Sequence, residues 1–275
     1  MWGALLMAVA TTCTLPTDAQ DAAGGRAFDV HLQVMDHSRS TTKRAAHVVV
    51  GPKAMQALKA NPKATLPLVY VWHGWGGSAV NIEKTFGPAL QDAIAVYGQG
   101  LPRRFPKLGH RALDGWQIET ADLSRRDLAF FDALHEKLVA TGCVDKARVT
   151  STGFSNGGLF SNVLACVRGD VLAAVAPLSG GGPPASSTCG RPVAAFVVHG
   201  TNDRVLPFAR GVSSVLHHSK TNRCSKAPYT TTQRGCRDGI GCAAAVRFCV
   251  HPGRHRLPLQ MRDEAVRFLL AQQKR

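Results

Sequence analysis

One serine in the sequence has the surroundings of a nucleophile. Ser155 is the centre of Gly153-Phe154-Ser155-Asn156-Gly157, which fits the pattern G-x-S-x-G. A serine hydroxyl is a weak nucleophile near neutral pH, so it needs a base within hydrogen-bond reach and an acid that orients the base. The pattern therefore indicates acyl-transfer chemistry if a strand precedes it, a helix follows it, and an acid and a histidine come later in the chain.

The acid candidate is Asp203, which follows the apolar segment 192–200 in the stretch "HGTNDRVLPF". If that segment is a strand of a parallel sheet, Asp203 lies just beyond its carboxyl end, where such sheets place active sites. A carboxylate that only closes an Asx turn is the alternative for this position. The chain order, with the acid after Ser155, favours the catalytic interpretation.

Two histidines compete as the base, because His251 and His255 lie close together in "HPGRHRLP". An exposed loop histidine is the ordinary alternative for either of them. His251 directly follows the apolar segment 243–250 and directly precedes Pro252, so we expect it at the end of a strand. A base reaches the nucleophile from a loop, and His255 is better placed for that. Residue type alone does not choose between them.

A second glycine-rich turn, "VWHGWGG" at 71–77, suits an oxyanion hole. Its glycines let backbone N–H groups approach a substrate oxygen closely. We expect the donors to be the backbone N–H groups of Trp75 and Asn156, and an ordinary turn between a strand and a helix is the alternative. The imidazole of His73 is interpreted as a structural hydrogen-bonding group rather than as a second base.

A parallel sheet would bring these residues together at one edge. The sequence suits such a sheet, because apolar segments alternate with helical patterns along the chain. Strands are expected at 45–51, 66–74, 93–98, 147–153, 172–180, 192–200 and 243–250, and helices within 81–92 and at 124–142, 158–169, 209–220 and 262–275. This alternation predicts a mostly parallel sheet with helices on both faces, in a single α/β domain over residues 26–275. Ser155 then lies between a strand and a helix. Residues 179–192 and the cysteine-rich stretch before His255 are expected to be irregular.

Residues 1–25 are expected to lie outside the fold, as a signal peptide or a disordered leader. An apolar stretch at 2–10 has the length of a signal-peptide core, and Thr17-Asp18-Ala19 fits a cleavage site between small residues. The chain has no run of about 18 apolar residues, so a membrane span is not expected. The leader predicts a secreted protein, either extracellular or periplasmic.

The sequence has 8 cysteines, which also favour an oxidising compartment. The spacing of the last four is not that of a zinc ribbon, so no metal site is expected. At least two disulfides are predicted within one set of cysteines: Cys189, Cys224, Cys236, Cys242 and Cys249. Removal of Cys13 with the leader would leave an odd number, so one thiol is expected to stay free, and Cys166 on a predicted helix fits that role.

The formal net charge is +15. Such a charge suits either an ordinary soluble surface or attraction to an acidic polymer. The basic residues are scattered and no recognition module is visible, so nucleic-acid binding is not expected. We expect a monomer.

From about residue 44 to its end, the chain resembles the secreted feruloyl esterase and polyhydroxybutyrate depolymerase family of α/β-hydrolases. The similar stretches are "PLVYVWHGWGGSA", "AVYGQGLPRRFP", "GWQI", "DLAFFDAL", "CVDKARVTSTGFSNGGLFSNVLAC", "LAAVAPLSG", "VVHGTNDRVLPF" and "HPGRHRLP". The resemblance implies that Asp203 is the acid of a catalytic triad and His255 its base. The family's Gly-His-x-Trp-Pro pattern becomes Arg254-His255-Arg256-Leu257-Pro258, which keeps the histidine and the proline.

These observations predict a secreted serine carboxylesterase that needs no cofactor and no metal. The resemblance places feruloyl esters of plant cell-wall polysaccharide first among its substrates. Polyhydroxybutyrate or another polyester is the alternative substrate. A peptidase, and a non-catalytic binding protein on the same scaffold, are more remote interpretations.

Overall fold

A computed structural model describes residues 12–16, 19–22, 24–104, 111–118, 125–182, 189–229 and 235–274. Within these ranges, one large sheet has the strand order β1-β2-β3-β5-β4-β8-β9-β10-β12-β11, and β6 pairs with β7 in a small separate ribbon. The strands are β1 (Gln20–Ala22), β2 (Gly25–Met35), β3 (Thr41–Val50), β4 (Leu66–Trp72), β5 (Ile94–Gly98), β6 (Leu101–Arg103), β7 (Leu113–Gly115), β8 (Val144–Phe154), β9 (Ala174–Leu178), β10 (Ala194–Gly200), β11 (Gly235–Asp238) and β12 (Val246–His251).

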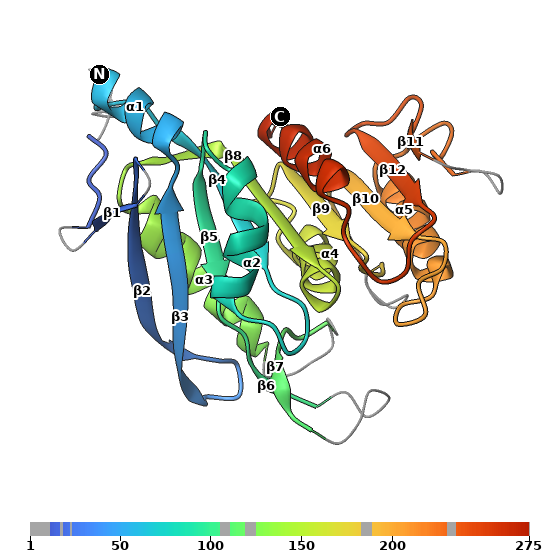
Figure 1. The fold of residues 1–275 in the computed structure, drawn as a ribbon, viewed down its shortest axis with the longest axis horizontal. Helices are drawn as coiled ribbons and strands as arrows, with labels where there is room; N and C mark the ends of the chain where they lie inside the picture. The colour runs from blue at the N-terminus through green and yellow to red at the C-terminus, as the bar shows by residue number, and fades with distance from the viewer. Residues whose placement is uncertain are drawn as a thin grey trace, which may run out of the picture.

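The centre of the large sheet is parallel, as the sequence predicts. Strands β5, β4, β8, β9, β10 and β12 pair in parallel, whereas β1, β2 and β3 at one edge and β11 at the other pair antiparallel. Because parallel neighbours end at the same edge, the residues that follow β4, β8, β10 and β12 gather there. Figure 1 shows the helices packed on the two faces of the twisted sheet.

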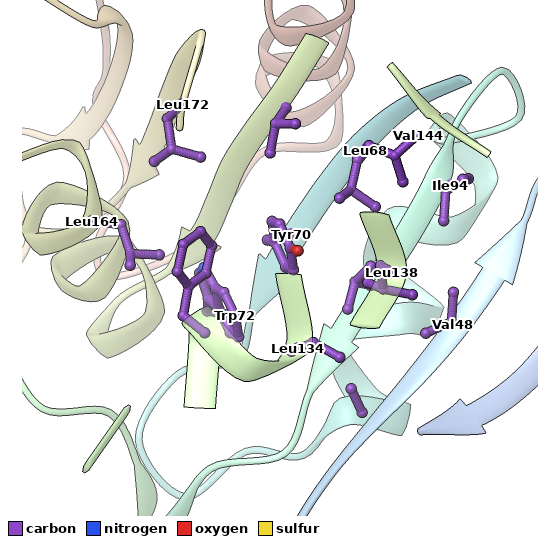
Figure 2. Packing of buried hydrophobic residues seen from close by; sticks show 14 of the residues in the cluster. Val48, Leu68, Tyr70, Trp72, Ile94, Leu134, Leu138, Val144, Leu164 and Leu172 are labelled. Carbon is purple, nitrogen blue, oxygen red and sulfur yellow. The ribbon is translucent and has the colours of Figure 1, made fainter. Parts of the chain in front are cut away.

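The helices are α1 (Pro52–Ala60), α2 (Ala79–Phe86), the 3₁₀ turn η1 (Gly87–Ala89), α3 (Arg126–Val139), α4 (Asn156–Val167), α5 (Phe208–Thr221) and α6 (Leu259–Leu270). Strand β4 is apolar on both of its sides, so helices must cover both faces of the sheet. Its alternate residues Leu68, Tyr70 and Trp72 pack with α3 and α4, whereas Val69 and Val71 pack with α2 and α6. All five side chains are fully buried. Figure 2 shows Leu134, Leu138 and Leu164 around Tyr70 and Trp72.

The helix predicted at 124–142 is confirmed as α3, and its apolar residues Leu128, Phe131, Leu134 and Leu138 are all buried. Ser124, where the predicted helix begins, lies outside the described residues. The sequence analysis missed β2 and α1, whose mixed polar and apolar residues lie at the edge of the sheet. It also treated the cysteine-rich stretch as irregular, whereas residues of β11 pair with β12 there.

Part of the segment predicted to be a leader, residues 12–16 and 19–22, contacts the domain in the structure, and the prediction that residues 1–25 are a signal peptide or a disordered leader stays untested. Cys13 forms a disulfide with Cys143 at the start of β8, and β1 pairs with β2. The partly buried Leu15 packs against the main core. Residues 1–11, which hold the apolar core of the predicted signal peptide, lie outside the described residues.

The predicted pair of disulfides near the carboxyl end is confirmed: Cys224 bonds Cys242, and Cys236 bonds Cys249. The predicted free thiol is wrong, because Cys166 on α4 bonds Cys189. The error arose because Cys13 was counted as removed with the predicted leader, which left an odd number of cysteines. All eight cysteines are bonded in pairs, and none of them is free.

Candidate active site

Ser155 occupies a sharp turn between β8 and α4. Its backbone angles, φ 56° and ψ −117°, lie in a region that side-chain-bearing residues rarely adopt, and such strain is common at functional sites. Backbone segments lie so close together at this turn that only glycine, which has no Cβ, fits at the two flanking positions. A Cβ at Gly157 would overlap the carbonyl oxygen of Trp72, and a Cβ at Gly153 would approach the backbone of Gly157. The turn therefore presents the hydroxyl of Ser155 at the carboxyl edge of the sheet.

Three of the predicted side chains form a continuous chain of hydrogen bonds. The Ser155 Oγ lies 2.8 Å from the Nε2 of His255. The Nδ1 of His255 lies 2.7 Å from the Oδ2 of Asp203. A neutral imidazole that donates from Nδ1 to the carboxylate has its Nε2 lone pair free to accept the serine proton, which is the arrangement that activates a serine.

Asp203 is held in place by its own loop. Its Oδ1 accepts hydrogen bonds from the backbone N–H groups of Val205 and Leu206, both at 2.9 Å. The carboxylate side chain is fully buried, whereas that of His255 is 15% exposed. The carboxylate is thus fixed from one side by the backbone, while part of the imidazole lies at the surface.

A second histidine, His199, supports the loop that carries Asp203. Its Nε2 donates to the carbonyl oxygen of Leu206 at 2.7 Å and lies 3.5 Å from the Oδ2 of Asp203. Burial lowers the pKa of His199. Because a neutral His199 does not compensate the negative charge of Asp203, that charge remains available to interact with His255. The sequence analysis missed this residue, although it directly precedes the "GTND" stretch.

His251, the competing base, has a different environment. It is the last residue of β12 and is buried, and its Nδ1 accepts a hydrogen bond from the backbone N–H of Gly253 at 3.0 Å. Burial and the nearby positive charge of Arg256 lower the pKa of His251. The structure brings His255, and not His251, to the hydroxyl of Ser155.

The turn expected to form an oxyanion hole lies beside the serine. A Cβ at Gly74 would be 3.5 Å from the Cβ of Ser155, so Trp75 follows directly after this close approach. Asn156 is the first residue of α4, so its backbone N–H belongs to the unpaired N–H groups at the start of a helix. The roles of these two N–H groups as oxyanion donors stay a prediction.

His73 has the structural role that the sequence analysis assigned to it. Its Nδ1 donates to the carbonyl oxygen of Gly74 at 2.7 Å, and its Nε2 accepts from the backbone N–H of Gly100 at 2.9 Å. Burial lowers its pKa, which keeps the ring neutral for these bonds. The indole of Trp116 donates to the carbonyl oxygen of His73 at 2.9 Å. His73 therefore fixes the turn that carries Trp75.

A buried ion pair lies below this network. The guanidinium of Arg44 on β3 lies 2.8 Å from the Oδ1 of Asp127 on α3, and neither side chain is exposed. The Oδ2 of Asp127 accepts from the backbone N–H of Gln117 at 2.7 Å. The pair thereby holds the residues after β7 next to the site. Sequence reasoning used "GWQI" and "DLAFFDAL" only as parts of the family resemblance and did not find this contact.

One grouping of potential metal ligands occurs among the described residues, and it comprises Cys236, Cys249 and Glu264. The two cysteines are bonded to each other, so they offer no thiolate to a metal ion. In the ranges that the structure describes, no helix has the length and apolar character needed to cross a bilayer.

Comparison with known proteins gives a consistent set of relatives, although no protein-family model matches the chain. The chain is 36% identical over 195 residues to a protein named probable feruloyl esterase C from Aspergillus niger, which covers 68% of this chain and 69% of the relative. It is 31% identical over 202 residues to feruloyl esterase C from Emericella nidulans, covering 71% of this chain and 72% of the relative.

Several solved structures with the same fold are named esterases or hydrolases. An S-formylglutathione hydrolase from Agrobacterium tumefaciens superposes with a TM-score of 0.61 at 13% identity, covering 92% of this chain and 98% of that one. An acetyl xylan esterase from Aspergillus awamori has a TM-score of 0.58 at 14% identity, covering 83% and 95%. At these identities the likeness concerns the fold, which is that of the α/β-hydrolases.

Proposed function

The chain belongs to the feruloyl esterase family, and on that premise we propose that Ser155, His255 and Asp203 are the catalytic residues of this carboxylic ester hydrolase. The observation that carries the proposal is the unbroken hydrogen-bonded chain from the Ser155 hydroxyl through His255 to Asp203. The strained turn that presents Ser155 supports the same assignment.

In the proposed mechanism, the Oγ of Ser155 attacks the ester carbonyl carbon while the Nε2 of His255 takes the serine proton. Asp203 holds the imidazole and stabilises its protonated form. The backbone N–H groups of Trp75 and Asn156 donate to the oxyanion of the tetrahedral intermediate. His255 then gives the proton to the leaving alcohol, and water releases the acyl group by the same steps with the roles repeated.

The proposed substrates are esters of hydroxycinnamic acids with sugars, because the relatives that share most of the chain are named feruloyl esterases. Polyester hydrolysis has no particular feature of the site in its favour. We also place the protein in a secreted, oxidising location. The four disulfides support this, since such bonds persist outside the reducing cytosol.

A substrate panel tests the proposal. Purified protein is assayed with methyl ferulate, acetylated xylan, hydroxybutyrate oligomers and a peptide substrate. We expect methyl ferulate to give the highest kcat/KM and the peptide to give no turnover. Hydrolysis of hydroxybutyrate oligomers in preference to methyl ferulate would replace the proposed substrate class. Failure to hydrolyse any ester would refute the assignment of the three catalytic residues.

A further inference from the structure

A pocket of about 420 Å³ lies between the two loops that carry the acid and the base of the site. One loop follows β10 and the other follows β12, so the pocket opens at the carboxyl edge of the sheet. Its lining is Asn202, Arg204, Pro252, Gly253, Arg254 and Arg256. The Nδ2 of Asn202 donates to the carbonyl oxygen of Pro252 at 2.7 Å, which joins the two loops.

Three positive charges line this pocket, and no carboxylate among the described residues forms an ion pair with them. Arg204, Arg254 and Arg256 are all exposed, and none of them forms an ion pair with any residue in the described parts of the chain. Elsewhere on the surface, by contrast, Arg168 pairs with Asp132 and Arg247 pairs with Asp238. Like charges gathered on a concave surface repel one another and create a strong positive potential, which an anion relieves.

The position of the three arginines indicates which half of the ester substrate they contact. Arg254 and Arg256 flank His255, and Arg204 follows Asp203. Because the Nε2 of His255 delivers its proton to the oxygen of the leaving alcohol, the alcohol half must lie against this histidine. The hydroxycinnamoyl half carries no charge close to the ester. The arginines are therefore placed to recognise the alcohol rather than the acyl group.

We infer that the alcohol half of the preferred substrate is an acidic sugar, whose carboxylate binds the pocket lined by Arg204, Arg254 and Arg256. The planar guanidinium group donates two parallel hydrogen bonds to a carboxylate, and this geometry favours arginine over lysine for such recognition. The substrate class is thus a hydroxycinnamoyl ester of a glycan that contains uronic acid. This inference rests on the proposed function and adds the charge of the sugar to it.

The test compares two ferulate esters that differ only in the sugar. One carries ferulate on a methyl glucuronoside and the other on a methyl glucoside, esterified at the same hydroxyl. We expect the wild-type kcat/KM to be higher for the glucuronoside by about tenfold or more, the size of one or two charge-assisted hydrogen bonds. The Arg254→Gln, Arg256→Gln double variant should lose most of this preference. High salt should also reduce it, because salt screens exposed charges.

The matched control is Arg39→Gln, which removes the same charge from an exposed turn between β2 and β3, at the opposite side of the sheet. This variant should keep the wild-type preference. A wild-type ratio near one, or a ratio that the double variant does not change, would overturn the inference while the proposed function stands. If neither ferulate ester is hydrolysed, the proposed function fails. Calorimetric binding of methyl glucuronoside but not methyl glucoside then still supports the pocket, and equal or absent binding of both overturns it.

Discussion

The side chain of Asn156 holds the backbone of Trp116 at both of its polar groups. Its Oδ1 accepts from the Trp116 N–H at 2.7 Å, and its Nδ2 donates to the Trp116 carbonyl oxygen at 3.1 Å. Gly115 lies between this amide and the indole of Trp75, since a Cβ there would be 2.8 Å from the Asn156 Oδ1 and 3.1 Å from the Trp75 Cδ1. Asn156, the residue after the proposed nucleophile, thereby fixes the segment that borders the proposed oxyanion hole.

The first prediction concerns this amide. Asn156→Ala should lower the free energy of unfolding by about 2–4 kcal/mol, because it leaves a buried N–H and a buried C=O of Trp116 without partners. Urea denaturation measures the change. Asn81→Ala, at an exposed position on α2, is the control and should change stability by less than about 0.5 kcal/mol. An Asn156 variant as stable as this control would contradict the role of the amide.

The second prediction concerns the nucleophile. Ser155→Ala should lower kcat for an ester by roughly 10⁴-fold or more, because the catalytic groups act as a unit. Circular dichroism and thermal unfolding should show a folded protein. Ser213→Ala on α5, where the serine is exposed and takes no part in the hydrogen-bonded chain of Ser155, His255 and Asp203, should keep full activity. Turnover retained by pure Ser155→Ala protein would rule out this serine.

The third prediction separates the two histidines. His255→Ala should lower kcat nearly as much as Ser155→Ala, because it removes the group bonded to the Ser155 hydroxyl. His251→Ala should have a much smaller effect on kcat, since His251 bonds only the backbone of its own loop. Steady-state kinetics of the two variants makes the comparison. The reverse order of effects would move the base to His251.

The fourth prediction concerns pH and stability. Burial lowers the pKa of His218 to about 3, and its Nε2 donates to the Oδ1 of Asn162 at 2.7 Å. In the unfolded chain this histidine has a pKa near 6.5, so between pH 6.5 and 3 only the unfolded state binds the proton. Its contribution to stability is complete above pH 6.5 and is lost as the pH falls. At pH 5 the loss should reach about 2 kcal/mol.

Urea denaturation at pH 7 and pH 5 measures this effect. His218→Gln should show a smaller drop in unfolding free energy between the two pH values than the wild type does. The control is His31→Gln, which replaces an exposed histidine on β2 and should keep the wild-type drop. Equal drops in the wild type and in His218→Gln would show that His218 does not carry this dependence.

The fifth prediction concerns the amino-terminal segment. If Cys13 is retained and bonded to Cys143, alkylation of the denatured but unreduced protein should modify no cysteine. The same protein should incorporate eight labels after reduction, which is the control. Labelling at Cys143 alone would indicate that cleavage near Ala19 removes Cys13. Mass spectrometry of the intact chain distinguishes these results.

Much of the candidate site could be predicted from the sequence, because the proposed chemistry requires residue types that are recognisable locally. Ser155 and Asp203 each follow an apolar strand, and parallel strands bring their carboxyl ends together. The choice of His255 over His251 needed the family resemblance. In the structure, the choice follows from the hydrogen bond between His255 and Ser155. These residues are 100 positions apart in the sequence, so no local sequence pattern reveals their contact.

The supporting contacts could not be predicted in the same way. The ion pair of Arg44 with Asp127 joins the third strand to the third helix, and the pattern of either element alone is compatible with a solvated charge. The disulfide bonds of Cys13 and Cys166 were not predicted, for a different reason. Connectivity depends on which loops meet in the fold, and an assumption about the leader changed the count of available thiols.

The bond between Cys13 and Cys143 has a consequence for proteolysis. It closes a ring over 130 positions of sequence, which includes β1 to β7 and the first three α-helices. A protease that cuts one peptide bond inside this ring opens a circle and releases no fragment. The two ends stay attached through sulfur, and the packed core holds them in register. The folded protein would thereby survive a nick that would divide a chain without this disulfide in two.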